Sequence, residues 1–154
     1  MKQIQIQLAF DVAESGQFMT LFYLAIDLSN RSLRWVRAGH DPAMFYDPYT
    51  DTFEELRGAG MALGVYADGR YREYQKSGLQ KGQIIALGSD GLWEARNPKG
   101  EMFGKDSICQ IIRSKPVATA REILTSCFNA LNVFVEDRAP EDDVTLVVIK
   151  ITKD

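Results

Sequence analysis

The sequence predicts an α+β fold in which antiparallel strands come first and helices follow. Three observations predict it. Strand-like segments of apolar, β-branched and aromatic residues fill positions 18–87, apolar residues recur at a spacing of three to four over 118–135, and one more apolar segment covers 144–151. The chain lacks the strand–helix alternation of a doubly wound parallel sheet, which leaves an antiparallel α+β arrangement.

The strands follow from alternation and turn chemistry. Residues 18–28 form an aromatic apolar strand, 27–31 a turn with Asn30 in a left-handed conformation, and Leu33 begins the second arm of a hairpin. Further strands are predicted at 43–46, 52–56, 71–77 and 83–87. Residues 2–10 alternate like a strand but equally suit a helix that ends at Gly16, so this segment stays open.

Helices are predicted in the last third of the chain. A short helix is predicted around residues 107–112, and a longer amphipathic helix is predicted over 118–135. Thr119 is a suitable N-cap, and Glu122 lies in the first turn. A last strand covers 144–151. We interpret Phe18, Phe22 and Trp93 as core residues.

Composition excludes several classes of protein. The 154 residues suit one globular domain, and 18 basic against 21 acidic residues give a net charge of −3, unlike the basic surface of a nucleic-acid-binding protein. No apolar segment is long enough for a membrane span, and a signal peptide is not evident. We interpret Cys109 and Cys127 as core-facing thiols in a reducing cytoplasm. His40 is the sole histidine, which excludes a multi-histidine metal cage.

Acidic or polar residues gather after or before three of the predicted strands. His40 and Asp41 follow one strand, Ser89 and Asp90 follow another, and Glu141, Asp142 and Asp143 precede the last strand. Carboxylates from separate strand ends suit a hard divalent cation such as Mg²⁺ or Mn²⁺. Each cluster also has a plain interpretation: Asp90 with Gly91 as an ordinary turn, the Asp142 pair as a solvated loop, and His40 as a hydrogen-bonded structural histidine.

Six segments in order carry a resemblance that none carries alone. They are FMTLFY at 18–23, VRAGHDPA at 36–43, GMALG at 60–64, SDGLWEARN at 89–97, GEMFG at 100–104 and DDVTL at 142–146. In their order and residue types, these segments resemble the motifs of the PPM-type (PP2C-like) serine/threonine protein phosphatases, in the SpoIIE-type bacterial branch. The resemblance implies an α-β-β-α sandwich of antiparallel sheets, here partial, and a centre of two Mn²⁺ or Mg²⁺ ions at which water, rather than a side chain, is the nucleophile.

The resemblance also implies roles for individual residues. Asp90 and Asp142 would be metal ligands, and Asp143 would be a ligand, a group that supports one, or only the start of a strand. Gly91 would provide a close turn that directs the Asp90 carboxylate, and Thr145 would hydrogen-bond a ligand carboxylate. The segment around His40 would lie near the cleft, without His40 itself as a ligand.

One part of the family pattern has no counterpart. The first metal motif, of the type Asp-Val-Ser-Gly-(His or Lys)-Gly, precedes all the matched segments, and residues 11–16 resemble it only at their start. We therefore expect a lead-in segment over 1–17, a truncated phosphatase domain over 18–154 with one bound metal or none, and no activity of this chain alone. The incomplete sheets would leave open edges that could support a homodimer.

Three hypotheses follow. The chain is the C-terminal part of an active phosphatase domain, a catalytically inactive phosphatase-like module that binds a partner protein, or an unrelated acidic metal-binding or structural α+β domain. In the first case the resemblance implies a cytoplasmic signalling enzyme. It would act on a phosphorylated regulatory protein of the anti-sigma-factor-antagonist (STAS) type, and its parent would carry an upstream sensor or receiver domain.

Overall fold

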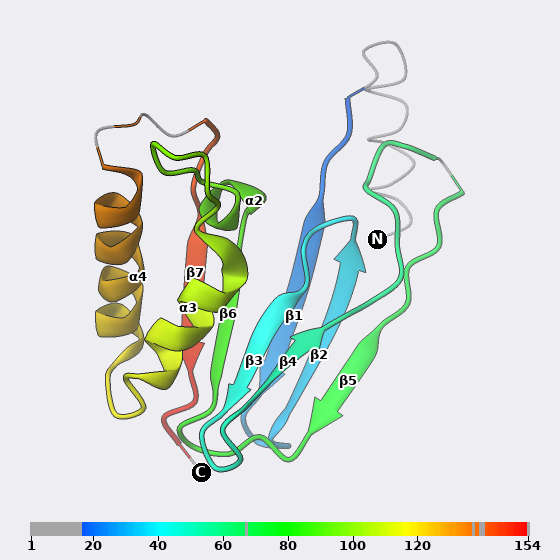
Figure 1. Ribbon diagram of the computed structural model, residues 1–154. Helices are drawn as coiled ribbons and strands as arrows, with labels where there is room; N and C mark the ends of the chain where they lie inside the picture. The colour runs from blue at the N-terminus through cyan, green and yellow to red at the C-terminus, as the bar shows by residue number, and fades with distance from the viewer. Residues whose placement is uncertain (1–16, 67, 137, 139–140, 154) are drawn as a thin grey trace. The chain divides into compact units, whose positions relative to one another are not determined.

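The computed structural model describes residues 17–66, 68–136, 138 and 141–153. The alternatives for residues 2–10 and the partial motif at 11–16 therefore lie outside the described residues. The chain divides into two compact units, one made of residues up to 42 with 56–79, the other of 43–55 with residues from 80 onward. Each unit contains one antiparallel sheet, and each is described by itself (Figure 1).

The first unit contains a three-stranded sheet in the order β1-β2-β5. Its strands are β1 (Leu21–Asp27), β2 (Ser32–Ala38) and β5 (Tyr74–Ser77), so the strand predicted at 71–77 is shorter than expected. The hairpin between β1 and β2 is confirmed, but its left-handed residue is Arg31 (φ 48°), not Asn30. Asn30 instead donates hydrogen bonds to the Asp27 carboxylate through its backbone and its side chain. These bonds stabilise the turn between Asp27 and Asn30, just before Arg31.

Packing within this unit centres on Trp35. Its ring stacks on that of the cross-strand neighbour Tyr74, with centroids 5.8 Å apart, and its indole N–H donates to the Arg57 carbonyl at 2.9 Å. The Tyr74 hydroxyl accepts from the Ala59 N–H at 3.0 Å, so the loop after residue 56 is held against the sheet. Phe18, expected in the core, is 64% exposed.

The second unit contains a four-stranded antiparallel sheet in the order β4-β3-β6-β7. Its strands are β3 (Ala43–Asp47), β4 (Thr52–Leu56), β6 (Ile84–Gly88) and β7 (Leu146–Lys150). Its helices are α2 (Asp90–Trp93), α3 (Gly104–Arg113) and α4 (Ala120–Val135). The two predicted helices and the last strand are confirmed, whereas the helical turn α2 stands where a plain turn was expected.

Helices α3 and α4 cover one face of this sheet (Figure 1). Alternate strand residues, among them Met44 and Ile84, pack with buried residues of the two helices, among them Ile112 and Cys127. Both cysteines are free, and Cys127 is fully buried. Burial raises the pKa of the Cys127 thiol to about 11, so it stays protonated and apolar at neutral pH.

Strands β1 and β5 are the edge strands of one sheet, and β4 and β7 are the edge strands of the other. A homodimer through these edges remains a prediction. Across the described ranges, each helix falls short of the length and apolar content that a bilayer crossing would require.

Helix α4 begins with a complete capping box, as the sequence indicates. The Thr119 hydroxyl accepts from the Glu122 N–H at 3.2 Å, and the Glu122 carboxylate accepts from the Thr119 N–H at 2.7 Å. The bond from the Thr119 backbone holds the pKa of Glu122 below its usual range. The box therefore stabilises the fold above the ordinary glutamate pKa and loses strength as the pH falls through the lowered value.

Replacement of Thr119 by Ala should lower the free energy of unfolding by about 1 kcal/mol, because α4 loses its N-cap acceptor. Urea unfolding followed by circular dichroism measures the change. Thr125→Ala, at an exposed position inside the same helix, is the matched control and should be neutral or slightly stabilising. Equal losses in the two variants would contradict the role of the cap.

Candidate metal centre

Strand pairing brings two acidic segments of the second unit together. Strand β6 runs antiparallel to β7, with Gly88 opposite Leu146 as the last pair. Because the end of one strand lies beside the start of the other, the residues just after Gly88 meet those just before Leu146. The Asp90 segment and the segment of Asp142 and Asp143 therefore lie at the same end of this strand pair.

Ser89 joins the two segments directly. Its backbone N–H donates to the Thr145 carbonyl at 3.0 Å, and its hydroxyl donates to the Asp143 carbonyl at 2.9 Å. The same hydroxyl oxygen accepts from the Thr145 N–H at 3.0 Å. Ser89 belongs to the predicted cluster with Asp90 and Gly91, but no role of its own was predicted for it, although a hydroxyl residue between a buried strand and a candidate ligand was a usable signal. These contacts of Thr145 involve its backbone, and its predicted hydrogen bond to a ligand carboxylate stays a prediction.

Gly91 lies against the opposite segment. A Cβ added to it would stand 2.6 Å from the Asp143 carbonyl oxygen and 3.3 Å from the Asp142 Cβ. Gly91 belongs to helix α2 and has no positive φ, so a left-handed turn is not the reason for glycine here. Glycine is required because the two backbones approach too closely for a side chain.

The two candidate ligands are held in the same way. One oxygen of Asp90 accepts from the Gly91 N–H at 3.1 Å, and one oxygen of Asp142 accepts from the Asp143 N–H at 2.7 Å. Both side chains are exposed, and within the described part of the chain no lysine or arginine forms an ion pair with Asp90, Asp142 or Asp143. Their second carboxylate oxygens are therefore available to a cation.

Oxygen donors without cationic partners fit a hard divalent ion such as Mn²⁺ or Mg²⁺. These residues would supply only part of the ligands of such a site. Residues 17–66, 68–136, 138 and 141–153 contain no group of three or more histidine, cysteine, aspartate or glutamate side chains placed to hold a metal. Water or residues outside these ranges would have to complete the coordination.

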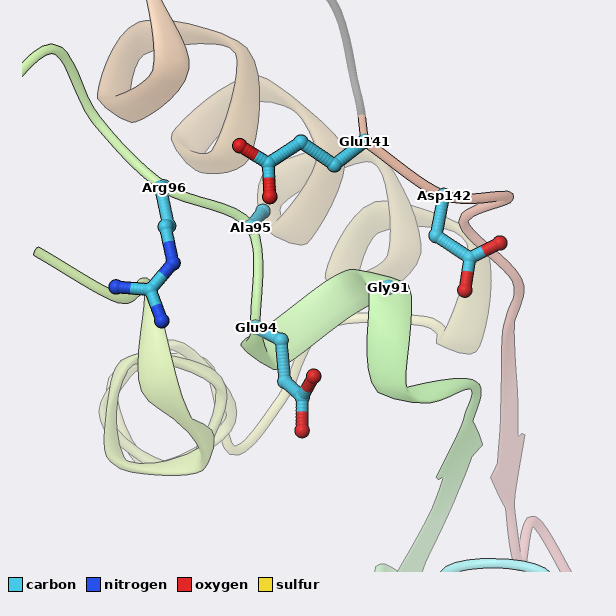
Figure 2. Close-up of a pocket in the computed structure, with 6 residues that line it drawn as sticks. All are labelled: Gly91, Glu94, Ala95, Arg96, Glu141 and Asp142. Atoms are coloured by element: carbon cyan, nitrogen blue, oxygen red, sulfur yellow. The ribbon is translucent and has the colours of Figure 1, made fainter. Parts of the chain in front are cut away.

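A polar pocket of about 230 Å³ lies beside these segments. It is lined by Gly91, Glu94, Ala95, Arg96, Glu141 and Asp142 (Figure 2). Arg96 donates to the Gly100 carbonyl at 2.7 Å, and Arg138 forms an ion pair with Glu141. Glu141 was predicted as part of the acidic cluster before the last strand. Glu94 and Arg96 were not predicted as part of a site, because their proximity to it depends on how the chain folds after β6 and before β7.

His40 belongs to the first unit. Its ring Nδ1 is hydrogen-bonded to the Thr20 hydroxyl at 3.0 Å. The neighbouring Gly39 (φ 72°) donates to the Gly60 carbonyl at 2.9 Å, and a Cβ on it would stand 2.7 Å from the Ala62 nitrogen. The second and third matched segments thus pack against each other. The position of His40 near the cleft stays a prediction.

The antiparallel sheets with their helices define an α+β domain of the PP2C-like class, as solved structures confirm. The PP2C domain of SiaA from Pseudomonas aeruginosa superimposes with a TM-score of 0.73 at 22% identity, covering 85% of this chain and 51% of that one. The phosphatase domain of SpoIIE from Bacillus subtilis, presoaked with manganese, gives a TM-score of 0.66 at 19% identity, covering 97% of this chain and 72% of that one.

The chain belongs to the family described as Stage II sporulation protein E (SpoIIE), which matches residues 2–152. The phosphoserine phosphatase RsbU of Bacillus subtilis is 28% identical over 137 residues, which are 89% of this chain but 40% of RsbU. This chain therefore spans less than half of that relative, and it corresponds to the C-terminal part of the phosphatase domain. The resemblance stated from the sequence is confirmed, and the hypothesis of an unrelated domain is wrong.

Replacement of Gly91 by Ala should destabilise the chain by about 1–3 kcal/mol, because the new methyl group collides with the Asp143 backbone. Chemical denaturation measures the loss. Gly100→Ala is the comparison, since open space surrounds Gly100 and its cost, about 1 kcal/mol, comes from its positive φ alone. A Gly91→Ala variant at least as stable as the unaltered chain would contradict the close approach.

Proposed function

We propose that this chain provides the C-terminal side of a metal-dependent serine/threonine protein phosphatase site. The observation that carries the proposal is the junction of the Asp90 segment with the Asp142 segment at the paired ends of β6 and β7. Family membership and the named activity of RsbU, a phosphoserine phosphatase, support the same reaction class.

Asp90 and Asp142 are the proposed ligands of Mn²⁺ or Mg²⁺. Divalent cations bound there would lower the pKa of a water molecule and offset charge on the phosphoryl oxygens. Asp143 is the third candidate, and its carboxylate is exposed. Gly91 allows the segments to approach, and Thr145 and Ser89 hold the strand ends together.

The charge of the site supports a dependence on cations. The exposed carboxylates of Asp90, Asp142 and Asp143 carry no cationic partner in the described residues. A phosphoserine group is itself close to doubly negative at neutral pH, so these carboxylates repel it. A bound divalent cation would offset most of that repulsion and would give the phosphoryl oxygens a positive group to approach.

Full activity in this proposal needs residues that the longer relatives carry in addition to the part matched here. The substrate is a protein phosphorylated on serine, of the regulatory, STAS-type antagonist kind, and the parent protein works in cytoplasmic bacterial signalling under an upstream sensor or receiver domain. These assignments rest on the family and on the relatives RsbU and RsbP, both named phosphoserine phosphatases.

The second candidate function is a catalytically inactive phosphatase-like module that binds a partner protein. The observation that favours it is that the described residues contain no group of three or more histidine, cysteine, aspartate or glutamate side chains placed to hold a metal. Such a module would bind a partner without hydrolysing a phosphoester. Hydrolysis of p-nitrophenyl phosphate that requires Mn²⁺ would exclude it.

Asp90→Asn and Asp142→Asn should each abolish stabilisation by Mn²⁺, because an amide oxygen lacks the charge of the carboxylate. Saturation at one hundred times the dissociation constant should raise the free energy of unfolding of the unaltered chain by about 2.7 kcal/mol, and EDTA should remove this gain. Thermal unfolding with and without Mn²⁺ measures both effects.

The matched control is Asp106→Asn, an exposed carboxylate in the first turn of α3. It should keep the full response to Mn²⁺. An equal Mn²⁺ response in the unaltered chain and the three variants would contradict the assignment of Asp90 and Asp142 as metal ligands.

A further inference from the structure

We propose that Ser89 is a positioning residue for the cation site. Its hydroxyl fixes the segment that carries Asp142 against the segment that carries Asp90, and thereby sets the affinity of the site for a divalent ion. The inference rests on the proposed function and adds to it a residue that does not itself bind the ion.

The strand ladder alone does not hold the Asp142 segment. The register of β6 and β7 ends at Gly88 opposite Leu146, so the ladder stops before either candidate ligand. Ser89 extends the connection past that point, because its N–H reaches the Thr145 carbonyl and its hydroxyl reaches both Thr145 and Asp143. Asp143 follows Asp142 directly, so the bond to its carbonyl restrains the backbone that carries the ligand.

The hydroxyl uses both of its hydrogen-bonding capacities within this junction. It donates to Asp143 at 2.9 Å and accepts from Thr145 at 3.0 Å. A hydroxyl is the short side-chain group that donates and accepts at one atom, whereas alanine offers neither function. The hydroxyl of threonine has the same capacity, so Ser89→Thr is the conservative variant.

Two glycines leave the space in which this junction forms. A Cβ at Gly88 would stand 3.0 Å from the Thr145 carbonyl oxygen, and one at Gly91 would stand 2.6 Å from the Asp143 carbonyl oxygen. The glycines therefore permit the close approach of the two segments. They do not select one relative position, and the directional bonds of Ser89 do.

The experiment compares the full chain with Ser89→Ala, Ser89→Thr and Ser114→Ala. Ser114 is the matched control, because its exposed hydroxyl also donates to a backbone carbonyl, that of Ile111 at 2.8 Å, at the end of α3. Two quantities are measured. One is the dissociation constant for Mn²⁺, from the electron paramagnetic resonance signal of the free ion, and the other is the hydrogen-exchange rate of the Thr145 amide without metal.

Ser89→Ala should weaken Mn²⁺ binding by roughly ten-fold, the lower end of the range for groups that orient metal ligands, and should accelerate exchange at Thr145. Ser89→Thr should restore both quantities, and Ser114→Ala should change neither. The rescue by threonine separates a loss of position from a general loss of stability, which the thermal midpoint of each variant records independently.

The outcomes separate the two proposals. Loss of Mn²⁺ binding in Asp90→Asn together with unchanged binding in Ser89→Ala would overturn the role of Ser89 and leave the proposed function intact. Mn²⁺ binding that is the same in Asp90→Asn and the unaltered chain would overturn the ligand assignment of the proposed function and with it the positioning role. No Mn²⁺ binding by the unaltered chain would overturn the positioning role in this chain. Faster exchange in Ser89→Ala would then assign the hydroxyl to loop order alone.

Discussion

The pairing of β6 with β7 is the constraint on which the candidate site depends. These strands are separated by 57 residues of chain between Gly88 and Leu146, yet they are neighbours in the sheet. Their antiparallel direction places the end of one beside the start of the other, and only this geometry brings Asp90 and Asp142 into the same neighbourhood. Helices α3 and α4 lie in the chain between these strands and cover one face of the sheet. Their packing therefore supports the strand pair that carries the site.

Beyond the paired ends of β6 and β7, the two segments are held by glycines that leave space for them and by hydrogen bonds that fix their relative position. Gly88 and Gly91 allow the backbones to approach, and Ser89 supplies the hydrogen bonds that choose one arrangement. This arrangement suits a site for Mg²⁺, because Mg²⁺ demands near-ideal octahedral positions of its oxygen ligands. It also concentrates the requirement for particular residue types into four consecutive positions, 88–91.

The electrostatic character of the second unit agrees with such a role. Two acidic side chains away from the site have cationic neighbours: Asp51 pairs with Arg113, and Glu55 lies 3.7 Å from Lys105. The hydrogen bond from Arg113 holds the pKa of Asp51 below its usual range. Among the described residues, Asp90, Asp142 and Asp143 form no ion pair with a lysine or arginine, although Arg96 lines the same pocket as Asp142.

Periodicity and turn chemistry were sufficient to predict most elements of this chain. The alternation at 52–56 and the capped apolar pattern at 118–135 predicted β4 and α4 almost to the residue, because local preferences and burial agree there. Ordered motifs identified the family and indicated Asp90 and Asp142 as candidate ligands. The short helix α2, the left-handed residue Arg31 and the exposure of Phe18 were not predicted, since each depends on neighbours that periodicity does not reveal. The role of Ser89 and the steric reason for Gly91 came from the tertiary structure alone. Both arise from contacts across more than 50 residues, and such contacts exist only once β6 and β7 have paired.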